Sequence, residues 1–443
     1  MPGSLFLFKD IKTSAKHGTV IYYSILAYIV SLFIKNIPVI SNGLMILILV
    51  FAIINTSRKN YFKQFGKEKV NIGIILFFVF QLLSVFFSSD KSSGFNILSL
   101  RVPLLIFPLA FCLIDFDQKI WKSILFFYVF ATIIASMVGF LYGSYLARLE
   151  NNTAYFYNDN ISELLLGKQA AYFGLYINVA ILAIVYLLKE NKDKAKPGNI
   201  LLFISIFWLL FINYMLASKM STLSLVVILI SALFINIIRK KKVLEGFILV
   251  FGVLIAIVIL DNVFPKTIDR FKTVTQTGFS FENTNAENSL DTRFDSAKWS
   301  SGSTRMALWT CGREIFVKHP IFGTGLGDIR NSLKEKYADK HFEYALNTNK
   351  NLHCQYFDIA VSMGAVGLLL FLFLFFAYPI KVFISNRQDF AVSVFICVGL
   401  CLLTENMFDR LQGEQIIAFI LPLSVKIFDV KEEALIDYQP DTY

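Results

Sequence analysis

Residues 359–376 read IAVSMGAVGLLLFLFLFF and contain no charged side chain. About 20 apolar residues in an α-helix are enough to cross the hydrocarbon core of a bilayer. Runs of similar length and composition occur at 70–88, 198–217, 220–238 and 243–260. Backbone amides and carbonyls cannot stay unpaired in hydrocarbon, so each run predicts a helix and not a strand.

The composition of the chain indicates an all-α integral membrane protein. Apolar residues make up 56% of the 443 residues and charged residues only 17%, whereas soluble domains carry roughly 25% charged residues. The net charge of +10 does not by itself indicate a nucleic-acid partner, because basic residues gather in the cytoplasmic loops of membrane proteins. The expected surroundings are therefore a lipid bilayer, with no nucleic acid bound.

About 12 transmembrane helices are expected from the apolar runs along the chain. Their ranges are 18–36, 38–56, 70–88, 95–114, 120–143, 166–188, 198–217, 220–238, 243–261, 352–380, 389–407 and 413–430. The expected organisation is therefore helices 1–9 within residues 1–261, a long and partly helical loop at 262–351, and helices 10–12 with a short tail within 352–443.

Basic residues in the connecting segments predict the orientation of the spans. If both termini are cytoplasmic, most lysines and arginines of the short connections lie on the cytoplasmic side, as the positive-inside rule requires. The loop at 262–351 then faces outward, since long loops cross a membrane largely regardless of charge. The basic residues left in short outer segments are Lys35, Lys91, Arg101, Arg148, Lys168, Lys219 and Arg410.

Three of these outer basic residues stand beside predicted spans. Arg101 and Lys168 lie near the starts of two different spans, and Lys219 lies in a short turn between two others. Charged groups next to hydrocarbon are costly and often functional. Each could instead anchor its helix by extending its charge to lipid phosphates. Because the three come from different spans on one face, we favour a shared anion-binding site.

The long loop contains a segment that predicts a helix, GSTRMALWTCGREIFVKHP at residues 302–320, capped by Ser303 or Thr304 and ending before the proline. The segment that follows has glycines at positions 323, 325 and 327. These do not indicate a dinucleotide site, because no strand precedes them. They predict either a turn whose amides approach a ligand or simply a tight loop.

Arg305, Trp309 and Arg313 recur at every fourth position of this predicted loop helix and are expected to share one stripe. A guanidinium group can bind a phosphate through two parallel hydrogen bonds, which lysine cannot do. The stripe therefore predicts a phosphate-binding surface. The alternative is a solvated basic face on a surface helix.

A candidate proton acceptor follows the loop. His353 stands at the outer mouth of the span 352–380, where a neutral imidazole near arginines suits a general base, although it could simply cap the helix. The segment TENMFDRLQGEQ at 404–415 places Glu405, Asp409, Arg410 and Glu414 on the same face. Glu405 could orient His353, balance the basic site, or cap a turn.

Together these segments resemble the O-antigen ligase and O-antigen polymerase superfamily of bacterial envelope enzymes. The motifs that carry the resemblance are the turn Ser218-Lys219-Met220, the R-x3-W pair Arg305 and Trp309, the HP-x2-G-x-G-x-G run of His319, Pro320, Gly323, Gly325 and Gly327, His353 followed by Gly364 and Gly367, and the 404–415 segment. The resemblance covers most of the second half of the chain and is weaker in the first.

The chain departs from the family pattern at two positions. Lys219 stands where the family usually has arginine, which keeps the charge but loses the planar fork. Cys354 stands where the family usually has asparagine after the histidine, so an amide that could position the acceptor is missing. Cys311 and Cys354 would both face the oxidising side, but nothing in the sequence fixes the distance that a disulfide requires.

The resemblance implies a metal-independent, inverting glycosyltransferase without a cofactor, in the bacterial inner membrane with its active site on the periplasmic face. The donor would be a glycan on undecaprenyl diphosphate, and the acceptor a sugar of the lipid A core or another lipid-linked glycan. The implied roles are diphosphate binding by Arg305, Arg313, Lys219, Arg101 and Lys168, general base catalysis by His353, and support by Glu405, Arg410, Trp309 and His319.

Several functions remain open from the sequence. Ligase and polymerase share their chemistry and differ in the acceptor, and the loop motif with its histidine favours the ligase. A secondary transporter would also have many spans, but transporters usually show repeated halves and interrupted helices. A non-catalytic scaffold for envelope assembly is a third possibility.

Overall fold

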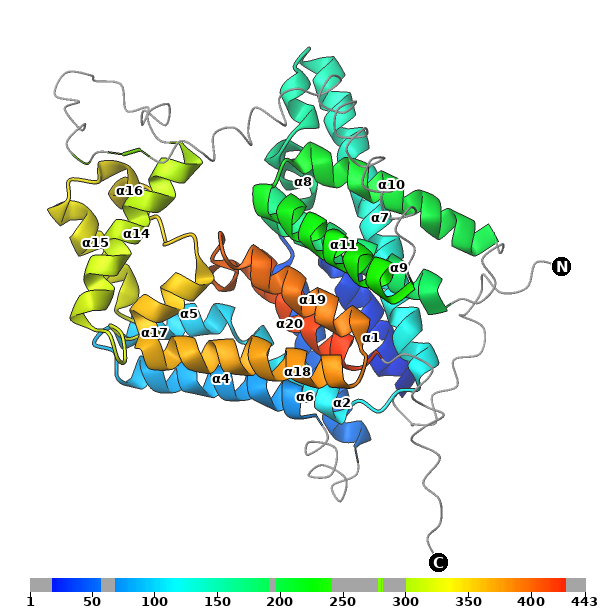
Figure 1. Cartoon of the computed structure of the whole chain (residues 1–443), viewed down its shortest axis with the longest axis horizontal. Coiled ribbons are helices and arrows are strands. Elements are labelled where there is room, and N and C mark those ends of the chain that lie inside the picture. The colour runs from blue at the N-terminus through cyan, green and yellow to red at the C-terminus, as the bar shows by residue number, and fades with distance from the viewer. Residues whose placement is uncertain are drawn as a thin grey trace, which may run out of the picture.

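A computed structural model describes residues 18–56, 68–190, 197–240, 278–279, 281 and 300–427, with side chains of the third range described as far as residue 231. Every regular element in these ranges is a helix, which confirms the all-α prediction for the described part of the chain (Figure 1). The expected span 243–261 and most of the loop before residue 300 lie outside it.

The α-helices are α1 (Gly18–Ser31), α2 (Pro38–Asn55), α4 (Lys69–Phe86), α5 (Lys91–Leu100), α6 (Pro103–Leu113), α7 (Gln118–Leu149), α8 (Asp159–Leu166), α9 (Ala170–Glu190), α10 (Pro197–Leu216), α11 (Lys219–Lys240), α14 (Ser301–Lys318), α15 (Ile329–Asp339), α16 (Glu343–Asn347), α17 (Gln355–Leu372), α18 (Tyr378–Ser385), α19 (Asp389–Cys401) and α20 (Leu411–Val425). Short 3-10 helices lie at Thr153–Phe156 and Met407–Asp409, and a π-helical turn at Phe373–Ala377 joins α17 to α18.

The helices are those of a multi-pass membrane protein. Six described helices are long and apolar enough to span a bilayer, or seven if the bent pair α5–α6 counts as one span. Shorter apolar helices are α1, α19, α20 and the first part of α11. The total of about 12 remains a prediction.

Helix α20 lies at the centre of the bundle, packed against α6 and α19. Every residue from Gly413 to Val425 is buried. Its residues from Ile416 to Leu423 are all apolar, as expected of a helix in such a central position, and Glu414 and Gln415 near its start are buried as well. Its Phe419 ring contacts the rings of Tyr28, Phe107 and Phe111 from α1 and α6.

The span predicted at 95–114 is interrupted. Its two halves, α5 and α6, meet at an angle of 44°. Pro103 occupies the first turn of α6, where its missing amide costs nothing but where it restricts the preceding backbone. The expectation of one continuous helix was therefore wrong, and the break places Arg101 inside the protein.

The helix predicted at 352–380 is also interrupted. Gly364 has a φ of 69° and a ψ of −170°, which no residue of an α-helix adopts. The loop segment Pro320–Gly325, called here the inserted segment, fills the interruption. Four backbone hydrogen bonds join it to the two sides of the break: Ala365 N to Pro320 O (2.9 Å), Val366 N to Ile321 O (3.2 Å), Thr324 N to Val361 O (3.0 Å) and Gly325 N to Ser362 O (2.8 Å).

Leu326 and Gly327, directly after the inserted segment, pack against the end of α4 and its connection to α5. The amides of Leu326 and Gly327 donate to the hydroxyls of Ser84 and Ser88 at 3.1 and 3.0 Å. A Cβ on Gly327 would lie only 2.1 Å from a backbone oxygen of this connection. These amides are used within the protein, so the structure favours the tight loop over the ligand-approaching turn.

Replacing Gly364 or Gly323 with alanine should detach the inserted segment. An added Cβ would lie 2.1 Å from Ile321 O at Gly364 and 2.4 Å from Met363 N at Gly323, and both glycines have positive φ. Backbone strain alone should cost roughly 1–3 kcal/mol of the free energy of unfolding at each site. Gly43→Ala is the matched control, because no atom lies within 4 Å of the added Cβ. Thermal unfolding in detergent would measure the difference; equal melting temperatures for all three variants would contradict the packing.

Candidate active site at one end of the helix bundle

Helix α14 is anchored at its start by a serine cap. The Ser300 hydroxyl accepts a hydrogen bond from the amide of Ser303 at 3.0 Å. The cap therefore lies before the predicted Ser303 or Thr304, while the helix ends before Pro320 as expected. Gly312 lets α14 pack closely against the segment that contains Leu352, since a Cβ on Gly312 would lie 2.8 Å from the Leu352 side chain.

Arg305 projects from the second turn of α14 toward the segment that precedes α20. Its guanidinium donates to Glu405 Oε1 at 3.2 Å and to the carbonyl oxygen of Thr404 at 3.3 Å. It also reaches the carbonyl oxygen of Ser301 at 3.3 Å. The side chain keeps an exposed fraction of 23%, so it is held in place but remains accessible to a ligand.

His353 lies on the other side of the Glu405 carboxylate. Its Nδ1 atom is 3.4 Å from Glu405 Oε2. A carboxylate accepts hydrogen bonds, so this contact favours the tautomer with a proton on Nδ1 and leaves Nε2 free to accept one. Trp309 fixes the neighbouring backbone by donating from its indole to the carbonyl oxygen of Leu352 at 2.9 Å. Arg305, Glu405 and His353 thus form one cluster, as the interpretation of Glu405 anticipated.

Lys219 joins this cluster from the start of α11. Its ammonium donates to the Ser301 hydroxyl at 2.7 Å, one helical turn before Arg305. A buried polar network supports the turn that carries it. Asn213 of α10 donates to Asn178 of α9 at 2.8 Å, and Asn178 donates to the carbonyl oxygen of Ser221 at 2.7 Å.

Lys168 lies in the turn between α8 and α9, outside the span that α9 forms. The side chain is 6% exposed, and no residue in the described ranges accepts a hydrogen bond from its ammonium. Burial lowers the pKa of Lys168 to about 8. The turn is joined to the segment before α20, because the Gln412 side chain bonds the backbone at Gly167 and Gln169.

Three predicted residues form no side-chain hydrogen bond or ion pair with the cluster among the described residues. A helix turns by ~100° per residue, so Arg313, eight positions after Arg305, is offset by about 80° and is exposed to solvent. His319 lies about 21 Å farther along at ~1.5 Å per residue. It borders a separate polar cleft of about 690 Å³ together with Asp90, Asp328 and Glu335. Arg410 is exposed beside the start of α20.

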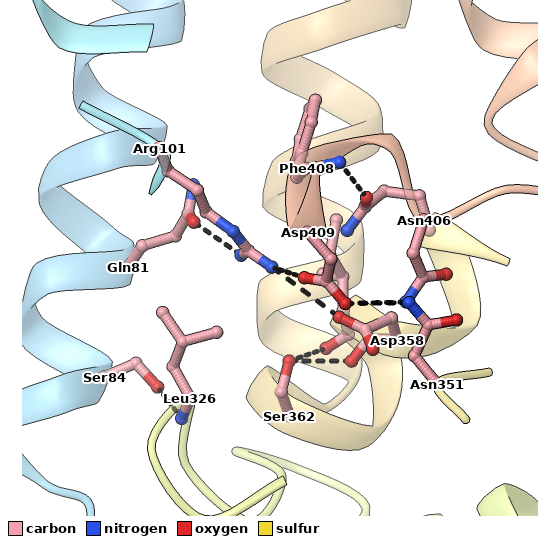
Figure 2. Close-up of polar contacts among 12 residues, drawn as sticks. Gln81, Ser84, Arg101, Leu326, Asn351, Asp358, Ser362, Asn406, Phe408 and Asp409 are labelled. Atoms are coloured by element: carbon pink, nitrogen blue, oxygen red, sulfur yellow. Dashed lines mark hydrogen bonds and ion pairs between the residues drawn. The ribbon is translucent and has the colours of Figure 1, made fainter. Parts of the chain in front are cut away.

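Arg101 is buried beneath the cluster and faces carboxylates of the protein itself (Figure 2). Its guanidinium donates to Gln81 Oε1 at 2.7 Å and to Asp409 Oδ1 at 3.0 Å. A second carboxylate, Asp358 Oδ2, lies 3.8 Å away. With an exposed fraction of 0%, Arg101 does not share a surface with Arg305, contrary to the single anionic site that we expected.

Sequence patterns alone did not single out Asp358 or Asn351, and they placed Asp409 only among the charged residues of the 404–415 segment. A usable signal was present, because a carboxylate at position 358 and a guanidinium at position 101 both fall in predicted spans, where opposite charges usually pair.

The two cysteines of interest, Cys311 and Cys354, are free and buried. Burial raises the pKa of both thiols, that of Cys311 to about 11.

These observations define a multi-pass membrane protein with a basic, partly exposed site at one end of its helix bundle. Residues 204–372 match the family model described as O-antigen ligase. This match confirms the resemblance to the O-antigen ligase superfamily, and the matched region includes Lys219, Arg305 and His353. No curated protein matches the chain.

Replacing Lys168 with methionine should stabilise the protein near neutral pH. The pKa falls from 10.5 to about 8 on folding, and each unit corresponds to ~1.4 kcal/mol, so the buried charge costs about 3 kcal/mol below pH 8. Between the two pKa values the unfolded state binds more protons, so wild-type stability rises with pH there. The variant should melt at a higher temperature at pH 7, and its advantage should shrink as pH rises toward 10.5.

The matched control for this measurement is Lys318→Met, which removes an exposed charge and should change stability by no more than about 0.5 kcal/mol. A Lys168→Met protein that is less stable than wild type at pH 7 would show that the buried ammonium has a favourable partner.

Proposed function

We propose that this protein is an O-antigen ligase-like glycosyltransferase that moves a glycan from undecaprenyl diphosphate to an acceptor hydroxyl. The site would face the periplasm from the bacterial inner membrane, with both termini cytoplasmic. The observation that carries the proposal is the cluster of Arg305, Lys219, Glu405 and His353. It combines cations for a diphosphate with a histidine whose free nitrogen can accept a proton.

The chemistry is a single displacement at the anomeric carbon. The acceptor oxygen attacks this carbon while the bond from the carbon to the diphosphate oxygen breaks. The electron pair of the broken bond leaves with the diphosphate, and the hydroxyl proton moves to Nε2 of His353. Glu405 holds the ring through Nδ1 and stabilises the imidazolium that forms. Attack opposite to the leaving group inverts the anomeric configuration.

Cationic side chains would stabilise the leaving group. A diphosphate that departs gains negative charge, and preorganised donors aimed at this charge lower the barrier. Lys219 donates to the hydroxyl of Ser301 and Arg305 to its carbonyl oxygen, so both cations lie close enough to reach one anion. We assign Lys168 to a second anion-binding position at the same end of the bundle. We assign Arg313 to an outer position, where it would contact the donor or acceptor glycan. The described residues offer no group of three or more His, Cys, Asp or Glu side chains for a metal ion, so the proposal gives this role to the cations.

The acceptor distinguishes two versions of the proposal. A ligase would use a sugar of the lipid A core, and a polymerase would use another lipid-linked glycan. We favour the ligase because of the loop-helix motif and its histidine, while the family match supports either version.

A secondary transporter is the alternative from another class, and one observation favours it. Two helices are interrupted, at Arg101 and at Gly364, and transporters use such breaks to bind solutes. Here both breaks are filled by protein groups: an ion pair in one and the inserted segment in the other. Solute flux into liposomes without glycan transfer would support the transporter.

Arg305→Ala and His353→Ala should each abolish attachment of surface polysaccharide in a deletion strain. Loss of one aimed donor should reduce turnover on the order of 10²–10³-fold. A gel profile of the surface polysaccharide measures the outcome at matched expression. Lys318→Ala is the matched control, because it removes an exposed charge from the same helix.

The gel profile separates the candidates. Full-length glycan that accumulates on its lipid carrier in the deletion strain indicates a ligase, and single repeat units indicate a polymerase. Normal profiles from both the Arg305→Ala and His353→Ala proteins would reject this site and favour a scaffold.

A further inference from the structure

The buried Arg101 is connected to the candidate base through two further side chains. Asp409 accepts from Arg101 with Oδ1 at 3.0 Å and from Asn351 Nδ2 with Oδ2 at 3.1 Å. Asn351 in turn accepts from the backbone amide of His353 with Oδ1 at 3.1 Å. Figure 2 shows Asp409 between the Arg101 guanidinium and the Asn351 side chain. We call this series the Arg101–Asp409–Asn351 relay.

The segment that carries Glu405, the carboxylate beside His353, is also held by buried contacts. Glu405 lies four residues before Asp409, in the segment that closes with the 3-10 turn Met407–Asp409. This segment is tied to the start of α17, because Gln355 N donates to Leu402 O and the amide of Phe408 donates to Gln355 Oε1, both at 2.9 Å. The backbone of His353 and its carboxylate partner therefore depend on one set of buried contacts.

His353 needs such support because its backbone is unfavourable. Its φ is +48°, a left-handed conformation that residues with a Cβ atom rarely adopt. The hydrogen bond to Asn351 holds this conformation, and Asp409 fixes the amide of Asn351 so that its oxygen faces His353.

Arg101 is unsuited to bind a donor directly. Its side chain is fully buried, its two terminal nitrogens bond Gln81 and Asp409, and the carboxyl group of Asp358 lies 3.8 Å away. The Phe408 ring lies 5.8 Å from the guanidinium carbon. A diphosphate could reach Arg101 only after these contacts were broken.

We infer that the Arg101–Asp409–Asn351 relay positions His353 against Glu405, and that Arg101 is a positioning residue and not a ligand of the diphosphate. This inference rests on the proposed role of His353 as the base. A misplacement of about 1 Å at a reacting group can lower the rate on the order of 10²-fold. Loss of the relay should therefore lower kcat and leave the KM for the donor unchanged.

A reciprocal exchange tests the relay. In Asn351→Asp the new carboxylate faces the carboxylate of Asp409. In Asp409→Asn the new amide faces two donors, the Arg101 guanidinium and Asn351 Nδ2. Each single variant should lose on the order of 10²-fold in kcat. In the double variant the new amide at 409 can donate to the new carboxylate at 351 and still accept from Arg101. It should recover to within about threefold of wild type, a coupling expected only of residues in direct contact.

The measurement is steady-state transfer by purified protein in liposomes with a lipid-linked glycan donor, with thermal unfolding recorded for every variant. Arg101→Lys should also lower kcat at unchanged donor KM, because one ammonium cannot satisfy both Gln81 and Asp409. The relay would be overturned if kcat of the double variant were reduced by the product of the two single reductions. A donor KM that rises at constant kcat in Arg101→Lys would also overturn it, since that result assigns Arg101 to donor binding.

A second readout keeps this inference separate from the proposed function. If His353→Ala retains wild-type kcat, the assignment of the base fails, and the relay is then judged by the rate at which diethyl pyrocarbonate modifies His353. Exposed His319 serves as the internal reference. The single variants should change the ratio of the two rates and the double variant should restore it. An unchanged ratio in both single variants would overturn the relay.

Discussion

The arrangement of the site depends on the interruption of α17 at Gly364. A break in a membrane helix leaves amides and carbonyls that hydrocarbon cannot satisfy. The inserted segment Pro320–Gly325 supplies the missing partners from the loop itself. Since this segment directly follows α14, the pairing holds the far end of that helix against the bundle. The hydrogen bond from Lys219 to Ser301 and the close contact of Gly312 with Leu352 hold the near end and the middle of α14, where Arg305 faces Glu405.

The two arginines near the site illustrate how burial decides the role of a charge. Arg101 is sealed among Gln81, Asp358 and Asp409, and a fully buried guanidinium is stable only when such partners compensate its lost hydration. Arg305 has one carboxylate partner and keeps part of its surface exposed. A ligand can therefore add to the contacts of Arg305, whereas it would have to displace those of Arg101.

The sequence predicted the helices well because the spans are long and free of charge. It placed Glu405, His353 and the basic residues on one face because they stand at span or helix ends, but it left open whether Glu405 orients His353, balances the basic site or caps a turn. It could not predict the two breaks. Pro103 marks a helix start as readily as a bend, and the departure of Gly364 from helical geometry depends on partners 40 residues earlier in the chain. The burial of Arg101 follows from the first break. Arg313 was misplaced because a repeat of four residues drifts around a helix of ~3.6 residues per turn.

The central claim is that one displacement, assisted by His353, transfers the glycan. The most direct test is the anomeric configuration of the new linkage, read by NMR from the product that purified protein makes with a lipid-linked donor of known configuration. The account predicts inversion, with one molecule of lipid diphosphate released for each linkage formed. Retention of configuration would contradict it, because a single attack from the face opposite to the diphosphate always inverts the anomeric carbon.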